Sequence, residues 1–238
     1  MTRSFLQGIF APVRKLLPKW LSDPIRNVGT AVLTPAIYSY RTGHFRSSLK
    51  RAAVSKNGEP IPWYTYPIID FLSDRDFKNK NILEFGGGQS TLWWAKRARR
   101  VVTFEGKREW HDRIRAGMPA NVELHHVSME DSKACACEVA EILSMKAYSQ
   151  YDVIVIDGLP RREMIEISCR VRAADGVIIC DNAEGYEFYE RFKDRGLSRV
   201  DFYGNAPGVV LPHCTSIYFG SSSFVFDHGI PICVPNND

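Results

Sequence analysis

The chain has 238 residues, of which 45% are hydrophobic and 24% are charged, as in an ordinary globular protein. This length allows one well-buried domain with an appendage and argues against two full domains. No run of about 18 apolar residues is present, so no transmembrane helix is expected, and the first residues do not resemble a signal peptide.

The net charge of +4 is divided unevenly along the chain. Residues 1–60 contain ten Lys or Arg and two Asp or Glu, whereas residues 61–238 carry a net charge of −4. The second segment also lacks a basic stripe with interleaved aromatics, which disfavours a nucleic-acid partner. The six cysteines form no pair of C-x-x-C motifs, and this usage predicts a protein of the reducing cytoplasm. The basic segment leaves association with a membrane open.

Residues 1–60 are predicted to form a basic helical N-terminal arm and linker. Apolar residues recur at helical spacing between Phe5 and Leu21, while Pro12 and Pro18 predict breaks. Peripheral membrane contact through residues 1–26 is one interpretation. We favour an arm that packs across its own domain or a second subunit of a homo-oligomer, because broken helices make poor interfacial anchors.

Residues 61–238 alternate between short apolar runs and helical periodicity. The predicted strands are 81–85, 101–105, 122–127, 152–157 and 176–180. The predicted helices are 66–73, 90–99, 109–117, 132–146, 162–171 and 186–195. Two further strands, 199–203 and 215–219, have no helix between them. The fold class predicted is therefore α/β, Rossmann-like and doubly wound, with a mostly parallel sheet and an antiparallel C-terminal hairpin.

A glycine turn follows the first predicted strand, in the run Glu84-Phe85-Gly86-Gly87-Gly88-Gln89-Ser90-Thr91. Glycines at this place let the backbone approach a ligand, and the next helix begins with free N–H donors. The third glycine of the dinucleotide motif is missing, and the Glu84 carboxylate would repel a pyrophosphate. A ligand with an ammonium group suits this turn better than NAD.

Glu105 ends the next predicted strand, 21 positions after Glu84. In a βαβ unit an acidic residue at this distance accepts hydrogen bonds from the hydroxyls of a ribose. The two carboxylates together predict a nucleoside that carries an amino acid.

With these motifs in order, residues 63–220 resemble the class I S-adenosylmethionine-dependent methyltransferases. The resemblance implies a seven-stranded sheet whose last strand is antiparallel. It places Glu84, Gly86 and Gly88 at the methionine end of the cofactor and Glu105 at the ribose. Residues 128–130 would flank the adenine. The full set predicted to bind cofactor is Tyr66, Glu84, Gly86, Gly87, Gly88, Ser90, Thr91, Glu105, Gly106, Ser128, Met129 and Asp157.

Three residues are predicted to act on the acceptor side: Asp157, Asp181 and His213. The fourth strand of the family ends beside the reactive methyl, and Asp157 stands at that end. His213 lies in the connection between the last two strands and is a candidate for acceptor contact or for a base.

Asp157, Asp181 and Asn182 also suggest Mg²⁺, because hard oxygen ligands suit that ion. The arrangement resembles that of metal-dependent catechol-type O-methyltransferases. However, Asp-Asn is also a common turn and capping pair, so the metal stays an open question.

The sequence thus predicts a methyltransferase domain at 61–238 that methylates an O or N atom of a small-molecule or glycan acceptor. Two alternatives remain at this point. One is an aminopropyl transferase-like enzyme, which would use a related sulfonium cofactor. The other is a non-catalytic nucleoside-binding module whose basic arm binds a membrane or a partner.

Overall fold

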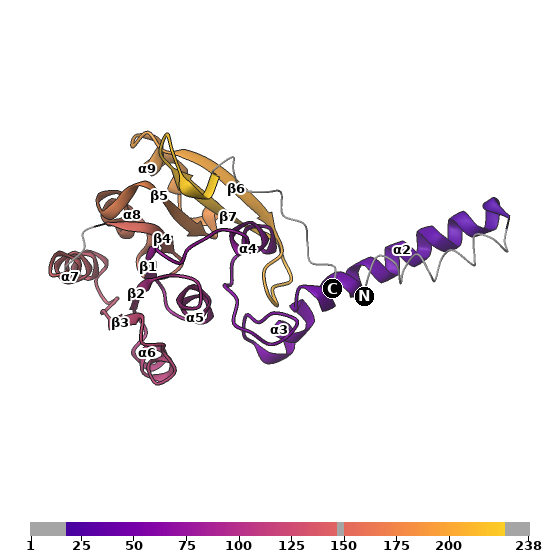
Figure 1. Cartoon of the computed structure of the whole chain (residues 1–238), viewed down its shortest axis with the longest axis horizontal. Coiled ribbons are helices and arrows are strands. Elements are labelled where there is room, and N and C mark those ends of the chain that lie inside the picture. The colour runs from indigo at the N-terminus through magenta and orange to yellow at the C-terminus, as the bar shows by residue number, and fades with distance from the viewer. Residues whose placement is uncertain (1–17, 147–149, 227–238) are drawn as a thin grey trace.

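A computed structural model describes residues 18–146 and 150–226 of the chain. One seven-stranded sheet forms its centre, in the order β3-β2-β1-β4-β5-β7-β6 (Figure 1). The strands are β1 (Asn81–Phe85), β2 (Arg100–Glu105), β3 (Val122–His126), β4 (Tyr151–Ile156), β5 (Arg172–Asp181), β6 (Ser198–Gly204) and β7 (His213–Phe219). Strands β1 to β5 are parallel, and β7 pairs antiparallel with both β5 and β6. The predicted hairpin is confirmed.

Helices cover both faces of the sheet. They are α4 (Tyr66–Ser73), α5 (Gln89–Ala95), α6 (Arg108–Arg115), α7 (Ser132–Ser144), α8 (Arg161–Val171) and α9 (Phe188–Lys193). The inner strands read as nearly continuous apolar runs because both of their faces are buried. One cluster joins α4 and α5 to one face, and a second joins α7, α8 and α9 to the other.

The alternation of side chains along each strand places the acidic residues on one face of the sheet. In β1, Ile82 belongs to the first cluster and Leu83 to the second, so Glu84 faces the same side as Ile82. The same parity applies to Glu105, Asp157 and Asp181. Since parallel strands end at the same edge, all four carboxylates lie on the α4–α5 side near the carboxyl ends.

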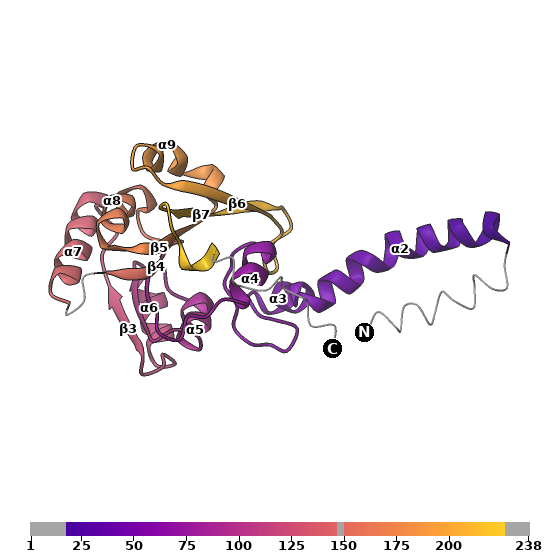
Figure 2. The same cartoon turned by 45° about the horizontal axis from the view of Figure 1, so that its top comes forward.

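The N-terminal part contains the helices α2 (Lys19–Arg41) and α3 (His44–Lys50). Both views show α2 projecting away from the sheet (Figures 1 and 2). Pro18 stands immediately before the first turn of α2, in agreement with the break predicted at this proline. Among the described residues, only the end of α2 contacts its own domain, through Tyr38 against Tyr66, because Val28 and Val32 are 64% and 66% exposed. Packing of the arm on a second subunit stays a prediction. Most of the apolar series before Leu21, and Pro12 with it, lies outside the described residues.

Residues 43–60 behave differently from α2, because they pack against the domain. Ala53 is fully buried in the first cluster, and the Ser47 hydroxyl bonds both the N–H and the carbonyl of Val54. Gly208 N donates to Nδ1 of His44, so the connection before β7 rests on α3. Within the described part of the chain, none of the helices is long and apolar enough to cross a membrane.

Most predicted boundaries shift by one or two residues, and α5 ends at Ala95 instead of 99. Strand β5 begins at Arg172 instead of 176. Arg172 pairs with Tyr151 of β4, and the register of the two strands shifts before the next pair, Val153 with Val177. Helix α9 begins at Phe188 instead of 186, because Glu187 has a left-handed backbone with φ of 58° that ends the preceding turn.

Candidate functional site

A cavity of about 670 Å³ lies at the carboxyl ends of the parallel strands. This is the place where open α/β sheets bind ligands, next to the point where strand order reverses between β1 and β4. Its walls include nine of the predicted site residues: Gly86, Gly87, Gly88, Ser90, Glu105, Met129, Asp157, Asp181 and His213. Five predicted residues are not on its walls: Tyr66, Glu84, Thr91, Gly106 and Ser128.

Glu105 holds the glycine turn in place. Its Oε2 accepts a hydrogen bond from Gly87 N at 3.0 Å, and its Oε1 accepts one from Lys107 N at 2.7 Å. On the other side of the turn, Trp110 Nε1 donates to the Gly87 carbonyl at 2.7 Å. A carboxylate has about four acceptor positions, so Glu105 retains two for a ligand in the cavity.

Two glycines bring the turns after β1 and β4 into direct contact. A β-carbon on Gly86 would lie 2.7 Å from Gly158 N, and one on Gly158 would lie 2.7 Å from the Gly86 Cα. Gly86 also has φ of 109°, which side chains other than glycine rarely adopt. The hydrogen bonds from Asp157 N and Gly158 N to the Phe85 carbonyl join the same two turns. The glycine at position 86 is therefore required by both space and backbone conformation.

Glu84 lies beneath the glycine turn and is fully buried. Its Oε2 accepts hydrogen bonds from the hydroxyls of Thr91 at 2.5 Å and Thr103 at 3.0 Å. Its Oε1 has no well-formed hydrogen bond within the described residues. Burial raises the pKa of Glu84 to about 7, against the opposing effect of the Ser90, Thr91 and Thr103 hydroxyls. A buried carboxylate oxygen without a donor fits the prediction of a ligand ammonium nearby.

The remaining predicted cofactor residues have structural surroundings of their own. The ring of Tyr66 packs edge-on against Tyr38 at 5.9 Å, on the side of α2. The Thr91 hydroxyl is used by Glu84, and Gly106 lies so close to Met129 that a β-carbon would meet its Sδ at 2.2 Å.

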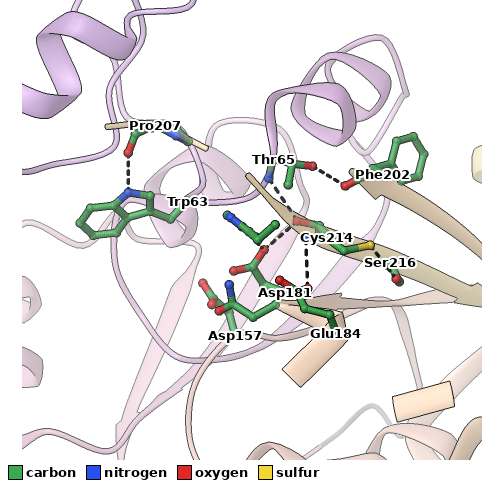
Figure 3. A network of polar contacts seen from close by, with 12 residues as sticks. Trp63, Thr65, Asp157, Asp181, Glu184, Phe202, Pro207, Cys214 and Ser216 are labelled. Carbon is green, nitrogen blue, oxygen red and sulfur yellow. Dashed lines mark hydrogen bonds and ion pairs between the residues drawn. The ribbon is translucent and has the colours of Figure 1, made fainter. Parts of the chain in front are cut away.

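Sequence reasoning did not find several of the residues that line the cavity. Trp110 and Lys107 follow β2, and no pattern in the sequence distinguishes them. Arg51 and Ala52 come from the segment interpreted as an arm and linker. Trp63 also lines the cavity, and it donates from Nε1 to the Pro207 carbonyl at 2.7 Å (Figure 3).

Asp157, Asp181 and His213, the three residues predicted to act on the acceptor, come together in the wall of the cavity. Asp157 and Asp181 lie side by side at the ends of β4 and β5 (Figure 3). Asp181 is buried, and its Oδ1 accepts from the Thr215 hydroxyl at 2.7 Å. The same oxygen lies 3.4 Å from Nε2 of His213. Burial, and then the neighbouring Asp181, raise the pKa of Asp157, whereas Asp181 raises the pKa of His213.

Arg161, at the start of α8, lies between these strand ends. Nη2 donates to the carbonyl and to Oδ1 of Asp157, at 2.5 and 3.2 Å. Nη1 donates to the Asp181 carbonyl and to Oδ1 of Asn182, at 2.5 and 3.2 Å. In the described part of the chain, no group of three or more His, Cys, Asp or Glu residues could hold a metal ion.

No family model matches the sequence, and no curated protein matches it. Among solved structures, the chain is similar to a methyltransferase from Geobacter sulfurreducens, with 17% identity, a TM-score of 0.49, and coverage of 90% of this chain and 97% of that one. It is also similar to an O-methyltransferase from Bacillus cereus in complex with SAH, with 19% identity, a TM-score of 0.49, and coverage of 82% and 97%. A precorrin-6y C5,15-methyltransferase from Geobacter metallireducens has 15% identity, a TM-score of 0.48, and coverage of 73% and 96%.

Similarities of this extent carry no conclusion about the chemistry of the cavity, which depends on the residues of this chain. The seven strands, the antiparallel β7 and the cavity at the strand ends are features of this chain itself. By these features, the chain has the fold that is expected from its resemblance to the class I S-adenosylmethionine-dependent methyltransferases.

Proposed function

We propose that this protein transfers a methyl group from S-adenosylmethionine to an O or N atom of a small-molecule or glycan acceptor. The observation that carries the proposal is the position of Glu105, which holds Gly87 and Lys107 while lining the cavity. Such a carboxylate presents its remaining lone pairs to a pair of ribose hydroxyls. Glu84, fully buried beneath the glycine turn, supplies negative charge near the amino-acid end of the same ligand without lining the cavity.

The protein's part in this reaction is to bind and align. The sulfonium cofactor supplies an activated methyl group, so the chain must hold the acceptor atom in line with it and exclude water. Asp157 lines the cavity with a side chain that is 22% exposed. From this position its carboxylate is placed to accept a proton from an acceptor hydroxyl or amine. His213 would donate a hydrogen bond to the acceptor or take that proton.

Calorimetry with S-adenosylmethionine, S-adenosylhomocysteine and NAD tests the choice of cofactor. We expect the first two to bind and NAD not to bind, because Glu84 beneath the turn disfavours a pyrophosphate. Binding of NAD alone would contradict the proposal. Once an acceptor is found, release of S-adenosylhomocysteine indicates methyl transfer, and release of methylthioadenosine indicates the aminopropyl alternative.

We also infer that α2 contacts an acidic membrane surface. Leu21, Ile25, Val28 and Val32 form one exposed apolar stripe, at spacings of four, three and four residues. Lys19 and Arg26 lie on the opposite side of the helix, in a segment with an excess of positive charge. An amphipathic helix of this kind binds anionic lipid both by burying its apolar stripe and by the attraction of its positive charges to the lipid headgroups.

Flotation with vesicles that contain phosphatidylserine tests this inference on the full chain. We expect the wild type to float and a Val28→Gln/Val32→Gln variant to remain in solution, because the variant removes apolar contact without changing charge. A Thr30→Gln/Thr34→Gln variant is the matched control on the polar side and should float. If all three proteins remain in solution, the inference fails. If the Val28→Gln/Val32→Gln variant instead has a lower molecular mass in solution than the wild type, the apolar stripe is the contact of a homo-oligomer.

A further inference from the structure

We propose that the guanidinium of Arg161 permanently fills the place that a divalent cation would take between Asp157 and Asn182. Those two residues and Asp181 suggested a Mg²⁺ site in the sequence. Arg161 would then act as an internal cation, a positioning residue that fixes the carboxylate of Asp157. The contacts that support this inference hold whatever acceptor the protein uses.

Four oxygen atoms converge on this one guanidinium. They are the carbonyl and Oδ1 of Asp157, the carbonyl of Asp181 and Oδ1 of Asn182, all within 3.2 Å of Nη1 or Nη2. A set of carboxylate, amide and carbonyl oxygens is what a hard divalent cation prefers. The donor set therefore fits such an ion chemically, and Arg161 already occupies its centre.

Arg161 is held there by its surroundings. Its side chain is only 12% exposed, and its Cζ lies 4.6 Å from the ring centroid of Tyr186. Its four terminal N–H groups are all used by the four oxygens, and a planar guanidinium remains charged at any physiological pH. A cation at the same point would have to displace a buried positive group and break four hydrogen bonds.

The charge balance of the cluster supports the same conclusion. Asp157 and Asp181 are two adjacent carboxylates that need compensation to stay ionised together. Arg161 supplies one positive charge, and His213, whose Nε2 lies 3.4 Å from Asp181, supplies another when protonated. With His213 protonated, these two positive charges balance the two carboxylates without a divalent ion.

The test is a manganese titration followed by electron paramagnetic resonance, in which bound Mn²⁺ loses the signal of the free ion. We expect the wild type to leave the signal unchanged, and an Arg161→Ala variant to bind one Mn²⁺ through the released oxygens. Arg162→Ala is the matched control, because Arg162 is exposed and pairs only with Glu187 at 3.2 Å among the described residues. It should behave as the wild type does. Adding Asp157→Asn to Arg161→Ala should abolish the acquired binding.

A second readout is the melting temperature with and without Mn²⁺. An ion that binds only the folded state raises this temperature, so the increase should appear in Arg161→Ala and be absent from the wild type. If Arg161→Ala does not fold, Arg161→Gln leaves a neutral side chain of similar reach, and the same gain is expected. Two results would overturn the proposal. In the first, the wild type binds Mn²⁺ and the Asp157→Asn change removes that binding. In the second, the Arg161 variant folds but binds no Mn²⁺. S-adenosylhomocysteine binding is measured separately, so failure here is distinguishable from failure of the proposed function.

Discussion

Replacement of Glu105 by glutamine is expected to weaken the binding of S-adenosylhomocysteine on the order of 100-fold. The amide keeps the size of the side chain but has two acceptor positions instead of about four. The N–H groups of Gly87 and Lys107 both donate to the carboxylate. In the variant, the side-chain NH₂ would face one of these two donors, which would lose its acceptor. Two hydrogen bonds to a charged acceptor are worth about 3 kcal/mol or more, which corresponds to that loss of affinity.

Calorimetry gives the dissociation constants of the wild type and of the Glu105→Gln variant. Glu109→Gln provides the control, because Glu109 is an exposed residue of α6 that does not line the cavity. Unfolding by urea shows whether the glycine turn remains intact in each variant. An affinity for S-adenosylhomocysteine that Glu105→Gln leaves unchanged would remove the basis of the proposed function.

Replacement of Glu84 by glutamine is expected to stabilise the ligand-free protein at pH 8 while weakening cofactor binding. Burial raises the pKa of Glu84 from 4.5 to about 7, so at pH 8 the folded state holds a buried charge at a cost of about 3 kcal/mol. Glutamine can accept from Thr91 and Thr103 as Oε2 does, without that charge. The same change removes the negative partner of a ligand ammonium, which should cost about tenfold or more in affinity.

The sign of the pH dependence distinguishes this effect from a general change in packing. Between pH 4.5 and about 7 the folded wild type binds a proton at Glu84 that the unfolded chain does not. The free energy of unfolding of the wild type therefore falls as pH rises through this window. Urea unfolding should give similar stabilities for the two proteins at pH 5 and a more stable Glu84→Gln variant at pH 8. Equal stabilities at both pH values would contradict a raised pKa.

The sheet and the acidic edge were predictable because they depend on local patterns. Each inner strand is an apolar run bounded by a turn, and the alternation of side chains fixes which residues share a face. Glu105, Asp157 and Asp181 were expected at one edge, and all three line the cavity. Helix α4 and strand β1 have the bounds predicted for them, because local sequence patterns also determine where these two elements begin and end.

The rest of the site depends on contacts between distant segments, which no local pattern encodes. Arg161 belongs to none of the motifs described above, and its four hydrogen bonds to the ends of β4 and β5 arise only when those strands are adjacent. Arg51 reaches the cavity because α3 rests on the connection before β7. Glu84 was predicted to face the ligand directly, but the Thr91 and Thr103 hydroxyls, brought together by folding, hold it beneath the turn.

The contact between Gly86 and Gly158 limits how this protein could acquire a new acceptor. Because neither turn has room for a β-carbon, the distance between the turns after β1 and β4 is fixed by main chain alone. Changes of specificity would have to come from surrounding segments that tolerate larger side chains, such as the exposed Val210 and Leu211, which follow the cavity-lining Val209 in the chain. The reaction geometry could thus stay constant while the range of acceptors evolves.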